Sequence, residues 1–310
     1  MITCDGKSKH ANPSHLFYFV QPVALIDYAI NLDYFKEVTI MKKLLVLFVA
    51  ALMLFTCTFA FVGCGENTLI VYTNAFFAPF EYYQGRKIVG VDVDVMKLVG
   101  EKLDKKVKFV NVDFQAIVPA VSEGVLCDAG AAGITITTSR QEQVDFSTPY
   151  YKSVQYVIYK ATNNQVATTT ATNGKTVVLW ESLAGMKIGV QTDTTGHLYV
   201  GDEIDGGVLA QTNAECTPFS DAQLAVDAIG ANQMDVVVVD ELPAQWICNK
   251  NTQYVCAPLY YDADTATEEE YAICVTKGNQ ALLDAINEVL AELGKDGIDQ
   301  LVKKHMGLED

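Results

Sequence analysis

Residues 127–146 read CDAGAAGITITTSRQEQVDF, and the interpretation of the chain starts from them. A run of small residues, typical of a buried strand, leads into a polar turn. The spacings of Thr138 with Gln141 and of Ser139 with Glu142 both fit a capping box. The stretch therefore predicts a strand, a turn and the start of a helix.

Arg140 would lie in the first turn of this helix, where the helix dipole favours acids over cations. A cation at this end suggests an anionic partner outside the helix. Peptide N–H groups at a helix start also attract anions. We infer a site for a carboxylate-sized anion at the end of a strand, with a solvated arginine at a helix end as the alternative.

Length and charge narrow the class of protein. The chain has 310 residues, half of them apolar, which suggests about two domains. Its formal net charge is −16. An acidic surface of this kind argues against nucleic acid and anionic membrane lipid as ligands.

Residues 41–62 have the features of an export signal. Two lysines precede an apolar run, and Gly63 and Cys64 follow it. This order is similar to a lipoprotein signal, in which residues 41–63 are removed and Cys64 is lipidated. The residues just before Gly63 depart from the usual Leu-Ala, and an uncleaved transmembrane anchor is the alternative. Either way, the rest of the chain would lie outside the cytoplasm.

Residues 1–40 precede this signal and fit no targeting pattern. Met41 is a natural start for the signal. We therefore interpret residues 1–40 as an upstream extension from a mis-assigned start codon and leave them out of the fold.

Five cysteines follow Cys64, and their number leaves at least one unpaired. Cys248 and Cys256 bracket a short polar turn and are the most plausible pair for a disulfide. The interpretation that we favour over a disulfide framework is that all five are small buried apolar residues. Their spacing with histidines matches no metal site, so we expect no metal and no cofactor.

The first part of the chain predicts an α/β lobe with a largely parallel sheet. Strands and helices alternate, and the expected strands are 68–73, 107–112 and 153–159, with helices at 91–103 and 117–123.

A second α/β unit follows a Thr/Asn-rich stretch at 161–173 that we interpret as a loop or linker. Its expected elements are strands at 187–190 and 235–239 and a helix capped by Ser220 and ended by Gly230. An acidic loop is expected at 262–270, then a strand at 271–276 and an amphipathic helix at 279–293, with a last helix reaching Gly307.

Complementary charged groups are expected at strand ends. Asp240 ends an apolar strand, where a carboxylate is costly unless it is paired. Thr194 and Thr195 lie between a strand and a helix and offer free N–H groups to an anion. Because ligands of open α/β sheets bind beyond the carboxyl ends of the strands, Arg140 and Asp240 together would suit a zwitterion. The alternative for Asp240 is a helix cap.

The chain resembles the extracytoplasmic solute-binding proteins of polar amino-acid ABC importers. The resemblance covers residues 66 to 307 and rests on motifs in family order, among them 74–81, 90–94, 132–137, 144–147 and 235–240. It implies a type II periplasmic binding protein, family 3: two α/β lobes joined by two crossing strands, closing on one free L-amino acid. The implied segments are 64–160 and 259–310 for the first lobe and 161–258 for the second. The implied partners are the permease subunits, with the membrane reached through the lipid anchor.

The resemblance also implies roles for individual residues. Arg140, with the backbone N–H groups of Thr135 and Thr195, would hold the ligand carboxylate. Asp240, the Gly133 carbonyl and the Thr135 hydroxyl would take the ammonium group. The other lining residues would be Ala132, the phenyl walls Phe77 and Phe114, and Asn74, Gln191 and Val239 at the side-chain end.

Family members that prefer cationic side chains carry an acid where this chain has Asn74. A neutral polar ligand such as glutamine or cystine is therefore expected, with Glu81 the suspected counter-charge if a cation binds instead. One alternative is an enzyme resembling cyclohexadienyl dehydratases, for which Glu81 is the candidate acid or base. A second is a sensor domain, which would need a long C-terminal extension.

Overall fold

The computed structural model describes residues 67–308. The expected upstream extension, the signal segment and the lipidated Cys64 lie outside these residues. Within 67–308, no helix combines the length and the apolar character needed to cross a membrane.

The first lobe is built on a five-stranded sheet in the order β5-β1-β6-β16-β7. β1 runs parallel to β5 and β6, whereas β16 is antiparallel to β6 and β7. Helices α2 and α8 pack on one apolar cluster of this sheet and α3 on another. The bounds are β1 Thr68–Thr73, β5 Lys106–Asn111, β6 Ala129–Gly130, β7 Val144–Phe146, β16 Cys274–Thr276, α2 Val91–Lys102, α3 Ile117–Glu123, α4 Thr138–Gln141 and α8 Gln280–Met306.

A small antiparallel sheet, β2-β3-β4, carries the aromatic loop of this lobe. Its strands are Phe76–Phe77, Glu81–Gln84 and Lys87–Val89, and the short 3-10 helix η1 at Phe114–Ala116 follows β5 in the sequence.

The second lobe contains the sheet β12-β11-β13-β8-β14-β10-β9. β11 lies parallel to both β12 and β13, and β8 runs antiparallel to β13 and β14. The bounds are β9 Thr169–Thr170, β10 Thr176–Leu179, β11 Lys187–Gln191, β12 Glu215–Phe219, β13 Val236–Asp240, β14 Tyr254–Tyr260, η2 Trp180–Leu183, α5 Thr195–Asp205, α6 Ala222–Gly230 and α7 Glu241–Lys250.

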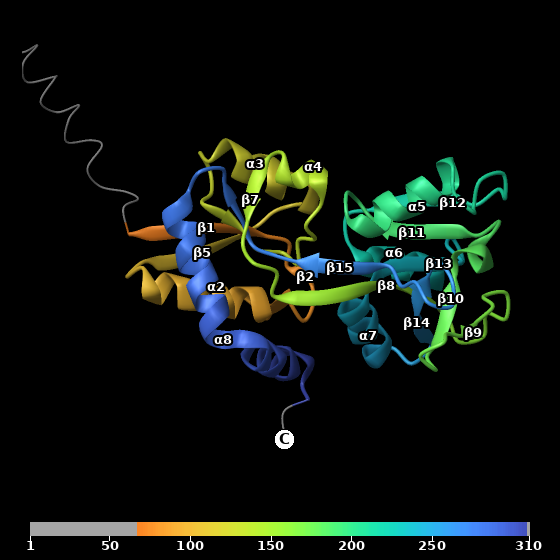
Figure 1. Ribbon diagram of the computed structural model, residues 1–310. Coiled ribbons are helices and arrows are strands. Elements are labelled where there is room, and N and C mark those ends of the chain that lie inside the picture. Colours follow the sequence, from red (N-terminus) through yellow and green to blue (C-terminus); the bar gives the residue numbers. More distant parts are fainter. Residues whose placement is uncertain (1–66, 309–310) are drawn as a thin grey trace, which may run out of the picture. The chain divides into compact units, whose positions relative to one another are not determined.

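Two strands connect the lobes (Figure 1). β8, Tyr151–Lys160, continues from the first lobe into the second sheet, and β15, Glu268–Tyr271, pairs antiparallel with its first residues. The expected acidic loop at 262–270 is therefore wrong at its end. The alternation of exposed and buried residues in β15 is that of a strand, because Glu269 and Tyr271 point inward.

Smaller corrections concern caps, a strand break and cysteines. The helix caps are Thr137 and Asp221, each one residue from the expected position. The expected strand 271–276 is interrupted between β15 and β16, and part of the 161–173 loop forms β9. The five cysteines among residues 67–308 are free, so Cys248 and Cys256 form no disulfide; Cys127 and Cys274 are buried and the other three are partly buried.

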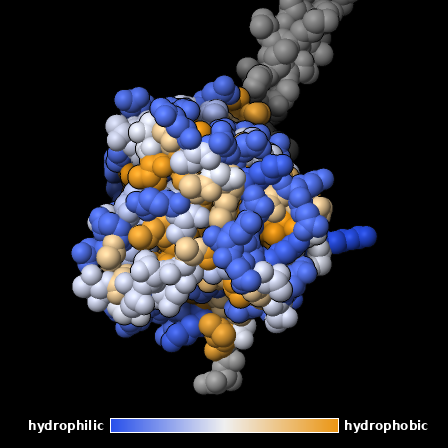
Figure 2. All heavy atoms as spheres, turned by 90° about the vertical axis from the view of Figure 1, so that its right-hand side faces the viewer, coloured by the Kyte–Doolittle hydropathy of each residue, from blue (hydrophilic) through white to orange (hydrophobic). Residues whose placement is uncertain are grey.

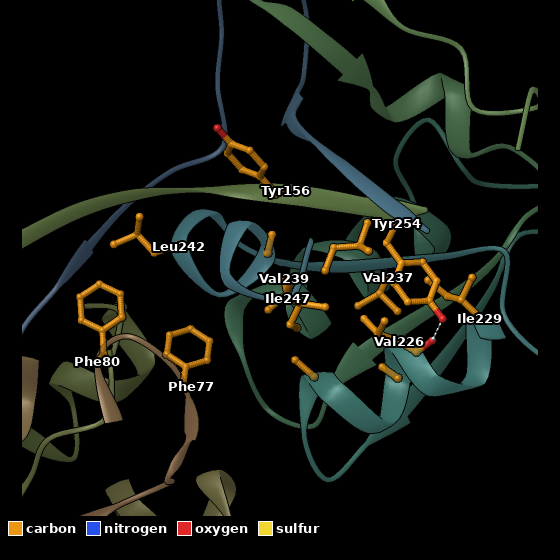
Figure 3. Packing of buried hydrophobic residues seen from close by; sticks show 14 of the residues in the cluster. Phe77, Phe80, Tyr156, Val226, Ile229, Val237, Val239, Leu242, Ile247 and Tyr254 are labelled. Carbon is orange, nitrogen blue, oxygen red and sulfur yellow. Dashed lines mark hydrogen bonds between the residues drawn. The ribbon is translucent and has the colours of Figure 1, made fainter. Parts of the chain in front are cut away.

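The apolar core of the second lobe extends to the first lobe (Figure 3). Phe77 and Phe80 from the aromatic loop belong to the same cluster as Val239 and Leu242. Val239 packs in this cluster and is not among the residues that line the cavity described below. The outer face shown in Figure 2 is largely hydrophilic, with apolar residues in small separate groups.

Candidate functional site

Arg140 is buried, with 8% of its surface exposed, so the solvated alternative is wrong. The Thr137 hydroxyl accepts a hydrogen bond from the backbone N–H of Arg140 and so caps the N-terminus of α4. The guanidinium donates to the carbonyl of Thr135 at 2.8 Å and to the carbonyl of Asp193, in the second lobe, at 2.9 Å. It also stacks over the Phe114 ring at 5.3 Å. Burial lowers the pKa of Arg140, and nearby acids, Glu269 first among them, oppose that shift.

Asp240 ends β13 and is 4% exposed. It stands at the N-cap position of α7, as the alternative held, but its side chain makes no capping hydrogen bond. One carboxylate oxygen accepts from Gln155 Nε2 at 2.8 Å and the other from the Tyr271 hydroxyl. Burial raises the pKa of Asp240 while these hydrogen bonds lower it.

One cavity is lined by both of these charged groups. Ten of the eleven lining positions implied by the resemblance come together here, all except Val239, and Thr194, which the sequence had placed beside Thr195, joins them. The lining residues are Asn74, Phe77, Phe114, Ala132, Gly133, Thr135, Arg140, Gln191, Thr194, Thr195 and Asp240.

Backbone donors from a helix start also reach this cavity. Thr195 is the first residue of α5, and the Thr194 side chain caps the helix by accepting the His197 N–H at 3.3 Å. The first N–H groups of a helix have no partner within the helix. They and the dipole therefore favour an anion here, on the same side as the Arg140 guanidinium.

Gly133 shapes the wall beside Phe77. Its φ of +54° lies in the left-handed region, and an added Cβ would lie 2.8 Å from Phe77 Cε1. Its N–H donates to Asp92 at 2.9 Å, which fixes the turn.

Two amides, those of Asn74 and Gln191, also line the cavity. Asn74 Nδ2 donates to the Val112 carbonyl at 2.8 Å, and Gln191 Nε2 donates to Asn74 Oδ1 at 3.0 Å. Gln191 is 2% exposed, and its Oε1 has no hydrogen-bond partner.

Glu81 does not line the cavity. Its carboxyl is fully buried and neither oxygen has a partner. Burial, with the charges of Asp92 and Asp240 adding to it, raises the pKa of Glu81 well above its ordinary value. Because Glu81 is not among the residues that line the cavity, it does not supply a counter-charge there.

Sequence reasoning missed Gln155 and Glu269, which come from the two connecting strands. Gln155 Nε2 donates to both Asp240 and Glu269, each at 2.8 Å. The run Glu268-Glu269-Glu270 looked like a solvated acidic loop. The signal that was available is the period of two, with Tyr271 as the next inward residue.

Comparison with known proteins assigns the chain to a family. The family model described as bacterial extracellular solute-binding proteins, family 3, matches residues 69–308. A probable histidine-binding protein of Neisseria gonorrhoeae is 28% identical, the match covering 77% of this chain and 83% of that protein.

Two kinds of solved structure are also similar. Structures of an ancestral arginine-binding protein with arginine and with glutamine are each 32% identical with a TM-score of 0.65; the matches cover 77% and 78% of this chain and 98% and 99% of those chains. An ancestral amino-acid-binding protein, a precursor of cyclohexadienyl dehydratase, is 26% identical with a TM-score of 0.65, over 78% of this chain and 96% of that one.

Proposed function

Because the chain belongs to the bacterial extracellular solute-binding proteins of family 3, we propose that it is the receptor of an ABC importer for a neutral, polar L-amino acid. The observation that carries the proposal is one cavity lined by a cation, a carboxylate and two uncharged amides. We assign the charged pair to the backbone of the ligand and the amides to its side chain. Relatives named as histidine- and arginine-binding proteins support an amino acid as the ligand.

The charged pair fits the backbone of an amino acid. In this proposal the guanidinium of Arg140 and the N–H groups at the start of α5 take the carboxylate. Asp240, with the Thr135 hydroxyl and the Gly133 carbonyl, takes the ammonium. Charge-assisted hydrogen bonds of this kind are stronger than hydrogen bonds between neutral groups, above all where water is excluded.

The two amides fit a side chain that donates a hydrogen bond. The Val112 carbonyl can only accept, so Nδ2 of Asn74 must face it, and Oδ1 of Asn74 therefore faces Gln191. Gln191 must then present Nε2 to Asn74, which leaves its Oε1 as a bare acceptor. An unpaired buried acceptor is costly, and a ligand amide N–H would satisfy it.

A charged side chain fits these amides less well. The lining residues assigned to the side chain are amides and phenyl rings, and Glu81 lies outside the lining. A buried lysine or arginine side chain would lack a counter-charge and would be expensive to bind. An acidic side chain would in addition face the bare oxygen of Gln191.

The dehydratase alternative has one point in its favour, the likeness to the dehydratase precursor. It required an acid or base at the ligand, and Glu81, the residue considered for that role, does not line the cavity. This weighs towards binding without chemistry.

A thermal-shift screen against the twenty amino acids and cystine tests the proposal, because a ligand that binds only the native state raises the melting temperature. We expect the largest shift from glutamine or another neutral donor side chain, with calorimetry giving the affinity. A largest shift from arginine or lysine would overturn the neutral assignment. No shift from any amino acid would overturn the receptor itself.

A further inference from the structure

Glu269 is a buried acid at the meeting point of the two lobes. It lies in β15, where Glu268 and Glu270 are exposed but Glu269 is only 3% exposed. A buried carboxylate is expensive unless hydrogen bonds satisfy it. Its partners therefore indicate what it is there to do.

Each lobe supplies one hydroxyl to the same oxygen of Glu269. Oε2 accepts from Thr135 Oγ1, in the first lobe, at 2.7 Å and from Thr195 Oγ1, in the second, at 2.8 Å. The other oxygen accepts from Gln155 Nε2 at 2.8 Å. The two hydroxyls lie 3.4 Å apart. Oε2 can receive both protons only when the lobes are in contact.

These contacts orient the two hydroxyls. A threonine hydroxyl has one proton and two lone pairs. Once the proton points to Glu269, only lone pairs remain for other neighbours. Thr135 and Thr195 both line the cavity, whereas Glu269 lies behind them. The hydroxyls can then accept a hydrogen bond from an ammonium group but cannot donate one into the cavity.

We propose that Glu269 is a positioning residue of the amino-acid site: it takes one hydroxyl proton from each lobe, which ties the closed lobes together and directs the lone pairs of Thr135 and Thr195 at the ligand ammonium. This rests on the proposed function. Its ligand class is a primary α-ammonium, so N-acylated amino acids are excluded.

The experiment compares Glu269→Gln and Glu269→Met with the control Glu268→Gln, whose side chain is exposed in the same strand. Glutamine keeps an acceptor oxygen without the charge, and methionine removes the acceptor. Using the tightest ligand of the screen, calorimetry should give affinities in the order wild type, Gln, Met. Methionine should weaken binding by about ten- to a hundredfold, mostly through faster release, and the control should change it by less than about twofold.

A double-mutant cycle tests the bridge between the lobes. If Glu269 acts through the second-lobe hydroxyl, Thr195→Val should remove much of the effect of Glu269→Gln. The comparison pair Glu269→Gln with Arg86→Ala, an exposed turn residue, should be additive.

The number of protons that the protein releases on ligand binding is a further measurement, because a purely structural role of Glu269 would leave it unchanged. The ionisable groups facing Glu269 are Asp240, Arg140, Tyr199, Tyr261 and Tyr271. An arriving ammonium favours the ionised carboxylate, so wild-type binding near pH 7 should release protons, measured as a heat that depends on the buffer. Glu269→Gln should release fewer.

The outcomes separate cleanly. If the wild type binds an amino acid but the glutamine variant shows wild-type affinity and proton release, the role of Glu269 is wrong and the receptor stands. If the wild type binds none, the proposed function fails instead. If the methionine variant does not fold, the affinity of Glu269→Gln and the double-mutant cycle with Thr195→Val test the role of Glu269.

Discussion

At the scale of single residues, the site uses backbone carbonyls to hold its cation. The Arg140 guanidinium donates to one carbonyl in each lobe and, among residues 67–308, forms no salt bridge. Carbonyls fix the plane of the guanidinium without neutralising its charge. The charge therefore remains for a ligand carboxylate, and the planar fork can pair with it in a bidentate way.

Replacing Arg140 by alanine should abolish measurable binding and leave the fold intact. The loss of a desolvated, charge-assisted pair is worth roughly 2–5 kcal/mol, or about one and a half to four decades in affinity. Asp240→Ala should act similarly on the ammonium side. Calorimetry with the exposed Arg86→Ala as control measures this, and near-normal affinity in Arg140→Ala would refute the clamp.

Glu269→Gln should stabilise the unliganded protein, increasingly so at higher pH. Burial and the Asp240 charge raise the pKa of Glu269 to about 8. Between about pH 4.5 and 8 the folded state then binds more protons than the unfolded one, so this group makes stability fall as pH rises through that window. Glutamine removes this dependence.

Urea unfolding at pH 5 and pH 8 measures the effect as a difference between variant and wild type. Glu81 and Asp92, whose pKa values are also raised by burial, are present in both proteins and cancel in the difference. Glu268→Gln should show no such pH dependence. A variant effect of equal size at both pH values would count against an ionisable Glu269.

Residues that break a local rule could be predicted from the sequence. From the sequence, Arg140 was expected in the first turn of a helix, against the dipole, and Asp240 at the end of an apolar strand, and each anomaly indicated a partner outside its own element. The Asp240 anomaly holds, whereas α4 is a single turn with Arg140 next to its last residue, so the dipole argument for Arg140 does not apply. Glu269 breaks no local rule, because an acid among acids is ordinary in a loop. Its burial depends on the pairing of β15 with β8, which is a contact between distant parts of the chain.

At the scale of elements, the residues of the site are positioned by the end of a strand and by the starts of helices. β13 delivers Asp240, α4 delivers Arg140 and α5 begins at Thr195. The strand–helix alternation made most of these elements predictable. Short pieces such as β9 and β15 were not, because a strand of two to four residues carries too few positions to show a period.

Gly133→Ala should weaken both stability and binding. The left-handed φ costs a side chain about 1–2 kcal/mol, and the new Cβ would push the Phe77 ring into the cavity. Gly294→Ala is the matched control, since Gly294 also has a positive φ but no atom within 4 Å of the added Cβ. The control should lower the melting temperature without changing ligand affinity. Equal affinity in both variants would mean that the Phe77 wall does not contact the ligand.

At the scale of the whole molecule, the site exists only where both lobes contribute. The Asn74–Gln191 bond, the Arg140–Asp193 bond and the two hydroxyls on Glu269 each join one lobe to the other. Opening the cleft would break all of them together. We therefore expect ligand binding, as proposed, to be linked to hinge closure, the motion known for periplasmic binding proteins.

The mature protein should begin at a lipidated Cys64, with translation starting at Met41. The basis is the order of basic residues, apolar run, Gly63 and Cys64 in the sequence. Mass spectrometry of the protein from the membrane fraction reads the N-terminal peptide directly. A peptide from upstream of Met41, or an unmodified Cys64, would contradict the anchor, and Cys64→Ser should release the protein from the membrane.

The carbonyl-held guanidinium has a consequence for the medium in which the protein works. A ligand carboxylate that reaches Arg140 displaces no protein carboxylate, so no ion pair within the protein has to break before the pair with the ligand forms. A zwitterion has no net charge, and the chain's net charge of −16 neither attracts nor repels it at long range. Dissolved salt therefore has little to screen. The affinity for the ligand should differ by less than about twofold between low and high ionic strength. The protein would then bind its ligand equally well at low and high salt concentrations outside the cell.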